Sequence, residues 1–164
     1  MCGIVGYVGP NVDGRALEVV MEGLSRLEYR GYDSAGVALL TPDGVLITKR
    51  AGKLANLVSA LAGKSLPDST TALGHTRWAT HGGPTDQNAH PHRGGADGKL
   101  ALIHNGIIEN FHRLRSELIE DGVVFLSETD TEVVAHLLAR SYDKLGDLTE
   151  AMRDVVGGLR GAFT

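Results

Sequence analysis

The chain opens with the run Cys2-Gly3-Ile4-Val5-Gly6-Tyr7-Val8, in which apolar residues directly follow the only cysteine. A short apolar run of this length is typical of a buried strand. Residues 3–8 are therefore predicted to form a strand with the cysteine at its N-terminal end. The rest of the chain alternates short apolar segments with longer helical ones, which indicates a protein with both sheets and helices.

Apolar residues recur at helical spacing in five later segments. In the first, Leu17, Val20, Leu24 and Leu27 share one face, and Asp13 is predicted to be the N-cap. The predicted helices span residues 13–27, 54–61, 109–121, 129–144 and 148–159. Gly122 is placed to end the third helix at its C′ position, and Thr129 with Glu132 to form a capping box for the fourth.

Further strands are predicted at residues 36–40, 45–50, 71–79, 100–106 and 123–127. The first two flank Thr41-Pro42-Asp43-Gly44, whose proline suits position i+1 of a turn, so they are predicted to form a hairpin. Residues 80–99 are rich in Gly, Pro and His. They exceed the roughly 12–15 residues beyond which a structureless loop is usually functional or disordered. Residues 159–164 look like the opening of another strand, so we expect the chain to stop inside a fold.

Composition limits the classes of function. With 164 residues the chain is one domain or a large part of one. The net charge is −4 with both signs mixed along the chain, so we expect no nucleic-acid partner. No apolar run reaches the ~18 residues that cross a bilayer, and no signal peptide is recognisable, so no membrane association is expected. A single cysteine excludes an internal disulfide, and the predicted location is cytoplasmic.

Five segments, taken in order, resemble the glutaminase domain of class II amidotransferases, the N-terminal-nucleophile type. They are Cys2-Gly3-Ile4-Val5-Gly6, Arg26-Leu27-Glu28-Tyr29-Arg30-Gly31-Tyr32-Asp33-Ser34-Ala35-Gly36, Gly74-His75-Thr76-Arg77-Trp78-Ala79-Thr80-His81-Gly82, His104-Asn105-Gly106-Ile107-Ile108-Glu109-Asn110 and Glu128-Thr129-Asp130-Thr131-Glu132. Within this family the residues of these segments are most similar to those of the enzymes that make glucosamine 6-phosphate from fructose 6-phosphate. The resemblance covers the chain from Cys2 to its last residue.

The resemblance implies an α+β fold, a four-layer αββα sandwich with antiparallel sheets, C-terminally incomplete in this chain. Residues 2–164 would be a truncated glutaminase domain. In full-length members two sugar-isomerase domains follow, and fructose 6-phosphate would bind only through them. Glutamine is the implied substrate, no cofactor is implied, and the full-length protein is expected to be a homo-oligomer.

Two interpretations of Cys2 are open from the residue alone. It is either a small buried hydrophobic residue or a nucleophile whose base is its own α-amine, freed when Met1 is removed. An ordinary α-amine loses its proton close to neutral pH, whereas a lysine amine stays protonated there. The resemblance favours the nucleophile. A chain that retains Met1 is expected to be inactive, because an amide nitrogen cannot accept the thiol proton.

Asn105 and Gly106 are implied by the resemblance to stabilise the oxyanion, through the asparagine side-chain amide and the glycine backbone N–H. The alternative is an ordinary Asn-Gly turn after a strand. A helical segment follows this pair, which fits a simple hairpin poorly.

The resemblance also implies that Arg77, Thr80 and His81 bind the α-carboxylate of glutamine, since a guanidinium matches a carboxylate in shape and charge. Asp130 would pair with the α-ammonium group, and Trp78 would lie next to glutamine. The alternatives are a surface charge for Arg77, core packing for Trp78 and a first-turn helix acid for Asp130.

The histidines near His90-Pro91-His92 lack the helical spacing of a zinc site, so no metal is expected. No glycine-rich phosphate-binding motif occurs, which argues against a nucleotide. Two other functions stay open. One is a class II amidotransferase with another acceptor, such as phosphoribosyl pyrophosphate or aspartate. The other is a glutamine-binding or assembly module without turnover.

Overall fold

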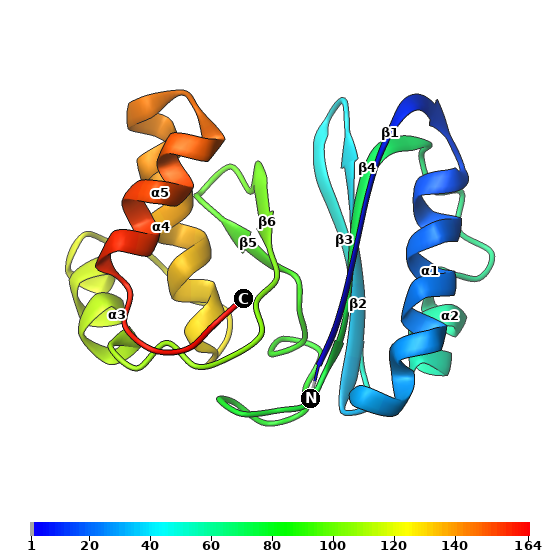
Figure 1. Ribbon diagram of the computed structural model, residues 1–164, viewed down its shortest axis with the longest axis horizontal. Coiled ribbons are helices and arrows are strands. Elements are labelled where there is room, and N and C mark those ends of the chain that lie inside the picture. The colour runs from blue at the N-terminus through cyan, green and yellow to red at the C-terminus, as the bar shows by residue number, and fades with distance from the viewer. Residues whose placement is uncertain (1) are drawn as a thin grey trace. The chain divides into compact units, whose positions relative to one another are not determined.

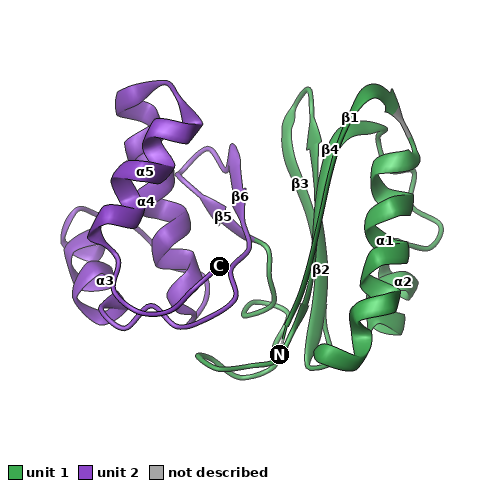
Figure 2. Cartoon of the chain, in the orientation of Figure 1, with its two compact units in different colours: residues 1–91 green, residues 92–164 purple. Residues whose placement is uncertain are grey.

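The computed structural model describes residues 2–164, apart from the side chain of Asp13. The prediction about Met1 therefore lies outside the described residues. The chain divides into two compact units, one reaching up to Pro91 and the other spanning His92–Thr164 (Figure 2).

In the first unit the described residues form a four-stranded antiparallel sheet in the order β1-β4-β2-β3. Two helices, α1 and α2, lie along one face of this sheet (Figure 1). The elements are β1 (Gly3–Asp13), α1 (Arg15–Leu27), the 3-10 turn η1 (Glu28–Arg30), β2 (Ser34–Thr41), β3 (Gly44–Ala51), α2 (Leu54–Leu61) and β4 (Ser69–Arg77).

A glycine lets α1 approach the sheet closely. Val20 and Leu24 are fully buried on the inner face of α1, as the helical periodicity predicts. A Cβ atom on Gly74 would lie 2.3 Å from Cγ1 of Val20 and 2.9 Å from Cδ1 of Leu24. The helix therefore packs directly on the backbone of β4.

The predicted hairpin is confirmed. β2 and β3 pair over their whole length, from Ser34 opposite Ala51 to Thr41 opposite Gly44. Gly44 has a φ of +118°, a conformation that side chains of L residues rarely adopt, so glycine suits the end of this turn.

The prediction that Asp13 caps the first helix is wrong. The backbone of Asp13 pairs with Ser69 as the last residue of β1, so the strand runs five residues beyond Val8. The N-cap of α1 is Gly14 and the helix begins at Arg15. Sheet pairing with β4 therefore outweighs the local capping signal.

The second unit has two short antiparallel strands and helices packed beside them. α4 lies against both strands, and α3 and α5 pack on α4. A Cβ atom on Gly94 would lie 2.1 Å from the carbonyl oxygen of Ala135, so α4 contacts the backbone of β5. The elements are β5 (His92–Gly94), β6 (Leu100–Leu102), α3 (Phe111–Glu120), α4 (Asp130–Leu145) and α5 (Leu148–Gly158).

Two strand predictions in this unit are wrong in extent or in kind. The predicted strand 100–106 ends at Leu102, and its partner β5 lies inside the predicted loop 80–99. Residues 123–127 are irregular. The N–H groups of Leu126 and Ser127 donate to the Glu132 carboxylate, so side chains instead of a neighbouring strand satisfy this backbone.

Residues 160–164 run antiparallel to residues 105–109. The backbones of Asn105 and Thr164 exchange hydrogen bonds of 2.9 and 2.8 Å, and Ile107 and Glu109 donate to Ala162 and Arg160. Gly106 and Phe163 form the bridge between them. The final residues are therefore extended and paired, as the sequence predicts.

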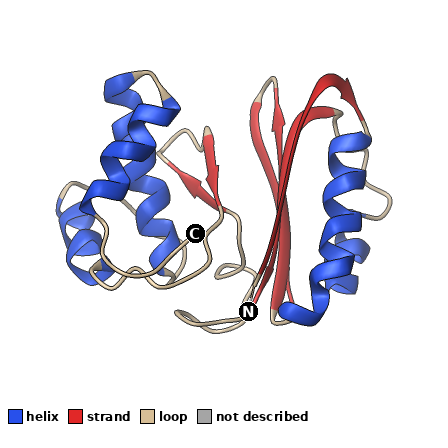
Figure 3. Cartoon of the chain, in the orientation of Figure 1, coloured by secondary structure: helices blue, strands red, loops and turns tan. Residues whose placement is uncertain are grey.

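The α+β class with antiparallel sheets is confirmed, and each unit combines a sheet with helices on it (Figure 3). Among the described residues no helix is long and apolar enough to cross a membrane.

Replacing Gly74 tests the close approach of α1. We expect Gly74→Ala to lower the free energy of unfolding by about 1–3 kcal/mol, because the added methyl group overlaps Val20 and Leu24. Gly6→Ala is the matched control on β1, since its Cβ would lie 3.7 Å from Leu73, an ordinary contact. Urea denaturation measures both, and equal effects of the two variants would contradict this packing.

Candidate functional site

The predicted site residues fall into two groups, one in each unit. The first unit holds Cys2, Arg77, Trp78, Thr80 and His81, and the second holds Asn105, Gly106 and Asp130. Each group is gathered by the local fold of its own unit.

The thiol of Cys2 lies at the end of β4. Gly3 pairs with Thr76, and this register brings Cys2 beside the residues that follow β4. The backbone N–H of Trp78 donates to Sγ of Cys2 at 3.2 Å, and Sγ lies 3.6 Å from the Trp78 carbonyl oxygen. Cys2 is half-buried and outside the core clusters. This placement favours a reactive thiol over a core residue, because a negative charge that develops on sulfur finds a donor there.

Arg77 is a buried cation at the centre of a tight loop. Its side chain is 3% exposed, so the alternative of a surface charge is wrong. The guanidinium donates to the carbonyl oxygens of His81, of Gly82 at 3.2 Å and of Gly83 at 3.4 Å. Residues 81–83 therefore wrap around Arg77, which directly precedes Trp78, the residue that contacts the Cys2 thiol.

The other loop residues are accessible. Trp78 is 45% exposed, which excludes core packing, and its ring meets the Tyr32 ring edge to face at 5.4 Å between centroids. Thr80 is exposed and His81 is half-buried.

Asp33 is a residue of this site that sequence reasoning did not single out. Its Oδ2 accepts the N–H of Ala79 at 2.9 Å, and its own N–H donates to the carbonyl of Arg77 at 3.0 Å. Asp33 thus fixes the backbone on both sides of Trp78. The sequence shows Asp33 within the Arg-Gly-Tyr-Asp segment, but it carries no signal for the contact of Asp33 with Ala79, 46 residues away.

In the second unit, the backbone N–H of Gly106 has a definite direction. The carbonyl of Asn105 accepts the N–H of Thr164. In a planar trans peptide the N–H of Gly106 points opposite to that carbonyl, hence away from residues 160–164. Gly106 has a φ of +128°, and a Cβ there would lie 2.2 Å from the carbonyl oxygen of Ala162, so only glycine fits.

Asp130 lies on the side to which this N–H points. Two residues after Gly106, the N–H of Ile108 also points away from residues 160–164 and donates to Oδ2 of Asp130 at 2.9 Å. Asp130 is 3% exposed and is the first residue of α4. The predicted oxyanion donor and the predicted ammonium ligand therefore share one side of the segment. The simple Asn-Gly hairpin is excluded, because the chain does not fold back at this pair and residues 105–109 pair instead with residues 160–164.

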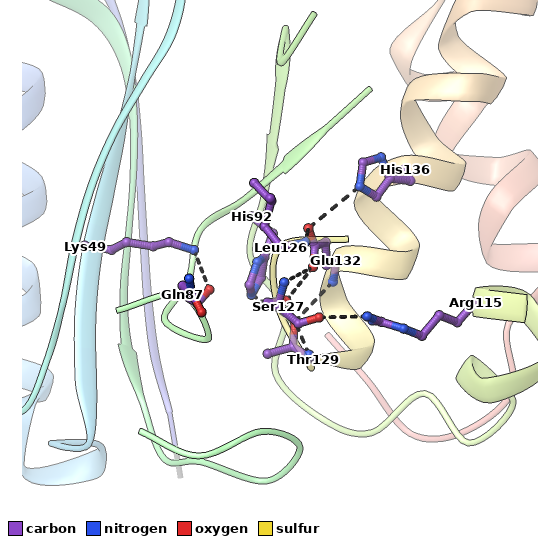
Figure 4. A network of polar contacts seen from close by, with 9 residues as sticks. All are labelled: Lys49, Gln87, His92, Arg115, Leu126, Ser127, Thr129, Glu132 and His136. Atoms are coloured by element: carbon purple, nitrogen blue, oxygen red, sulfur yellow. Dashed lines mark hydrogen bonds and ion pairs between the residues drawn. The ribbon is translucent and has the colours of Figure 1, made fainter. Parts of the chain in front are cut away.

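The first turn of α4 is fixed by a polar network (Figure 4). Oγ1 of Thr129 accepts the N–H of Glu132, so the first of the two hydrogen bonds of the predicted capping box is confirmed. The Glu132 carboxylate does not complete the box. It accepts instead from Leu126 N–H at 2.8 Å, Ser127 N–H at 2.7 Å and the Ser127 hydroxyl at 2.6 Å.

The histidines enter separate contacts. The rings of His75 and His90 stack at 4.5 Å, whereas His92 contacts Thr129 and His104 contacts Thr131. Within residues 2–164 no group of three or more His, Cys, Asp or Glu side chains could hold a metal ion.

A model of the "Glutamine amidotransferase domain" family matches residues 62–157, more than half of the chain. The chain belongs to the glutamine amidotransferase family. The resemblance found in the sequence is thereby confirmed. The family match includes Arg77 with its loop, the Asn105-Gly106 pair and Asp130.

Individual relatives agree with the family. The glutamine-fructose-6-phosphate aminotransferase (isomerizing) of Streptomyces coelicolor is 65% identical over all 164 residues, which cover 26% of that protein. The chain therefore spans about a quarter of the length of this curated relative. Among solved structures, one described as the allosteric regulatory enzyme of purine biosynthesis matches 99% of this amidotransferase chain and 34% of its own, with 30% identity and a TM-score of 0.81. The phosphoribosylpyrophosphate amidotransferase from B. subtilis matches 99% of this chain and 33% of its own, with 30% identity and a TM-score of 0.75.

Glu132→Gln tests the network at α4. Burial raises the pKa of Glu132, but His136, whose Nε2 lies 3.8 Å from the carboxylate, and hydrogen bonds from Ser127 and from backbone N–H groups outweigh it and lower this pKa from 4.5 to about 2. The ionised carboxylate therefore stabilises the fold above about pH 4.5 by up to about 3 kcal/mol, and this is lost as the pH falls towards 2.

We expect the wild-type protein to exceed Glu132→Gln in free energy of unfolding at pH 6 and the difference to shrink by pH 3, as urea denaturation measures. Glu117→Gln is the control, since Glu117 forms an exposed ion pair with Arg113 and should change little. A difference for Glu132→Gln that stays constant with pH would contradict the network.

Proposed function

We propose that this chain hydrolyses glutamine to glutamate and ammonia through a γ-glutamyl thioester on Cys2. The observation that carries the proposal is the Cys2 thiol at the N–H of Trp78, beside the loop around Arg77, in a chain of the glutamine amidotransferase family. A half-buried thiol beside a backbone donor is suited to nucleophilic attack on an amide.

The proposed reaction has two stages. With Met1 removed, the α-amine of Cys2 takes the thiol proton while Sγ attacks the side-chain amide carbon of glutamine. The tetrahedral intermediate collapses with cleavage of the C–N bond, and the α-ammonium group passes its proton to the departing ammonia. Water then attacks the thioester, the C–S bond breaks, and glutamate leaves with the thiol restored.

Asn105 and Gly106 are the proposed oxyanion donors. The outward direction of the Gly106 N–H supports this role, since the group is directed away from its own ladder. Removing one oxyanion donor typically costs about 2.7–4 kcal/mol of barrier.

Arg77, Thr80 and His81 are proposed to bind the α-carboxylate of glutamine, with Asp130 binding its α-ammonium group and Trp78 lying beside it. The burial of Arg77 and Asp130 supports these roles, because an ionic contact is stronger away from water. The exposure of Trp78 leaves its ring available to a ligand.

We further propose that residues 2–164 act as one glutaminase domain. The name of the Streptomyces relative supports ammonia transfer to fructose 6-phosphate, giving glucosamine 6-phosphate, in a longer protein. Its 65% identity exceeds the 30% of the phosphoribosylpyrophosphate enzyme, which favours this acceptor over the alternative. A homo-oligomeric full-length protein and a cytoplasmic location stay predictions.

Cys2→Ala decides between an enzyme and a glutamine-binding module. We expect the wild-type chain, with removal of Met1 verified by mass, to release glutamate and ammonia in equal amounts. Cys2→Ala should reduce both to the uncatalysed background, because no thioester can form. Equal release by wild type and Cys2→Ala would exclude the enzyme, and glutamine binding without release would favour the module.

Asp130→Asn tests the ammonium ligand. The asparagine oxygen can still accept the Ile108 N–H, so the fold should be retained while the charge is lost. We expect the KM for glutamine to rise about 10- to 100-fold, the usual cost of a charged hydrogen bond. Steady-state kinetics with a melting curve measures this, and an unchanged KM would assign Asp130 a purely structural role.

A further inference from the structure

Two neighbouring residues of α4 hold the segment on either side of Asn105 and Gly106. Oγ1 of Thr131 lies 2.9 Å from Nδ1 of His104, directly before the pair. Oδ2 of Asp130 accepts the N–H of Ile108, two residues after Gly106. The first turn of one helix thus contacts the segment both before and after the proposed oxyanion donors.

The contact between Thr131 and His104 is shielded from water. Thr131 is fully buried and His104 is 7% exposed. A hydrogen bond in such surroundings is stronger than one in water and holds its partners in one arrangement. The His104 ring also lies 6.3 Å from the ring of Phe163, the residue that bridges to Gly106. His104 is therefore held between α4 and the C-terminal segment.

We propose that Thr131 is a positioning residue, which acts through His104 to orient the Asn105 side chain and the Gly106 N–H towards the oxyanion. This inference rests on the glutamine hydrolysis proposed above. Neither Thr131 nor His104 takes part in that chemistry. The pairing with residues 160–164 sets the direction of the Gly106 N–H, and the contact of Thr131 with His104 anchors the residue directly before the pair. An oxyanion donor works only when it meets the oxygen at hydrogen-bond distance, and a displacement of about 1 Å can cost 100-fold in rate.

The expected effect on kcat and KM depends on the stage of the reaction at which the oxyanion forms. It forms in the transition state and not in bound glutamine, so displaced donors lower kcat and leave KM nearly unchanged. A residue that only stabilised the fold would lower the melting temperature without this separation of the two constants.

Thr131→Val removes the hydroxyl and keeps the shape. We expect kcat for glutamine hydrolysis to fall about 10- to 100-fold with KM within about threefold, and Thr131→Ser to restore most of the rate. Ser141→Ala is the matched control. It removes another buried hydroxyl from the same helix, one that donates to Asp154 at 2.7 Å, and it should leave both constants unchanged.

A second readout reports the oxyanion directly. The probe is an aldehyde analogue of glutamine, to whose carbonyl carbon the Cys2 thiol adds. A C–S bond forms, the C=O π bond breaks with its electron pair on the oxygen, the α-amine takes the thiol proton, and the oxyanion faces the proposed donors. Thr131→Val should lose affinity for this aldehyde by about the factor lost in kcat and keep its affinity for glutamate, which has no such adduct.

His104→Phe tests the route from Thr131. If both residues act through one contact, the double variant should be no slower than either single variant. Should Thr131→Val fail to fold, His104→Phe and Thr131→Ser still decide, since a wild-type kcat and aldehyde affinity in His104→Phe would overturn the proposal. A Thr131→Val protein equal to Ser141→Ala in both readouts would also overturn it. No ammonia release by the wild-type chain would instead mean that the proposed function itself fails.

Discussion

The pairing of β1 with β4 is the constraint on which the rest of the first unit depends. The register of Gly3 with Thr76 brings the start of the chain to the end of β4, so a thiol at position 2 meets the backbone of residue 78. Gly3 permits this approach, because a Cβ there would lie 2.7 Å from Cβ of Leu27 and 2.8 Å from Oγ1 of Thr76. Strand pairing thus carries a terminal residue to a loop far along the sequence.

The N-terminal turn of α4 has the corresponding role in the second unit. Each of its four residues contacts a different segment. Thr129 contacts His92 of β5, and Asp130 contacts Ile108. Thr131 contacts His104, and Glu132 contacts the irregular residues 126–127. Orphan N–H groups and accepting side chains concentrate at a helix start. One turn of helix can therefore hold several loops in place.

Each unit contains a buried charged side chain that holds the backbone of a proposed functional segment. Arg77 and Asp130 are almost fully buried, yet both bind backbone groups of the segments that carry the proposed chemistry. Burying such charges is unfavourable unless hydrogen bonds compensate it. Removing either side chain entirely is therefore expected to affect loop geometry as well as ligand binding, which is why conservative variants are the informative ones.

The sequence by itself determined the helices, the β2–β3 hairpin and the family, because periodicity, turn residues and ordered motifs are local signals. It misplaced the N-cap of α1, because the partner of Asp13 in β4 lies far along the chain. It also predicted a strand at residues 123–127, where the Glu132 carboxylate takes the place of a neighbouring strand. Only the tertiary structure decided which way the Gly106 N–H points, that Asp33 holds Ala79 and that Thr131 meets His104. Those facts depend on hydrogen bonds across 27 to 59 positions of the chain, for which single-residue preferences carry no information.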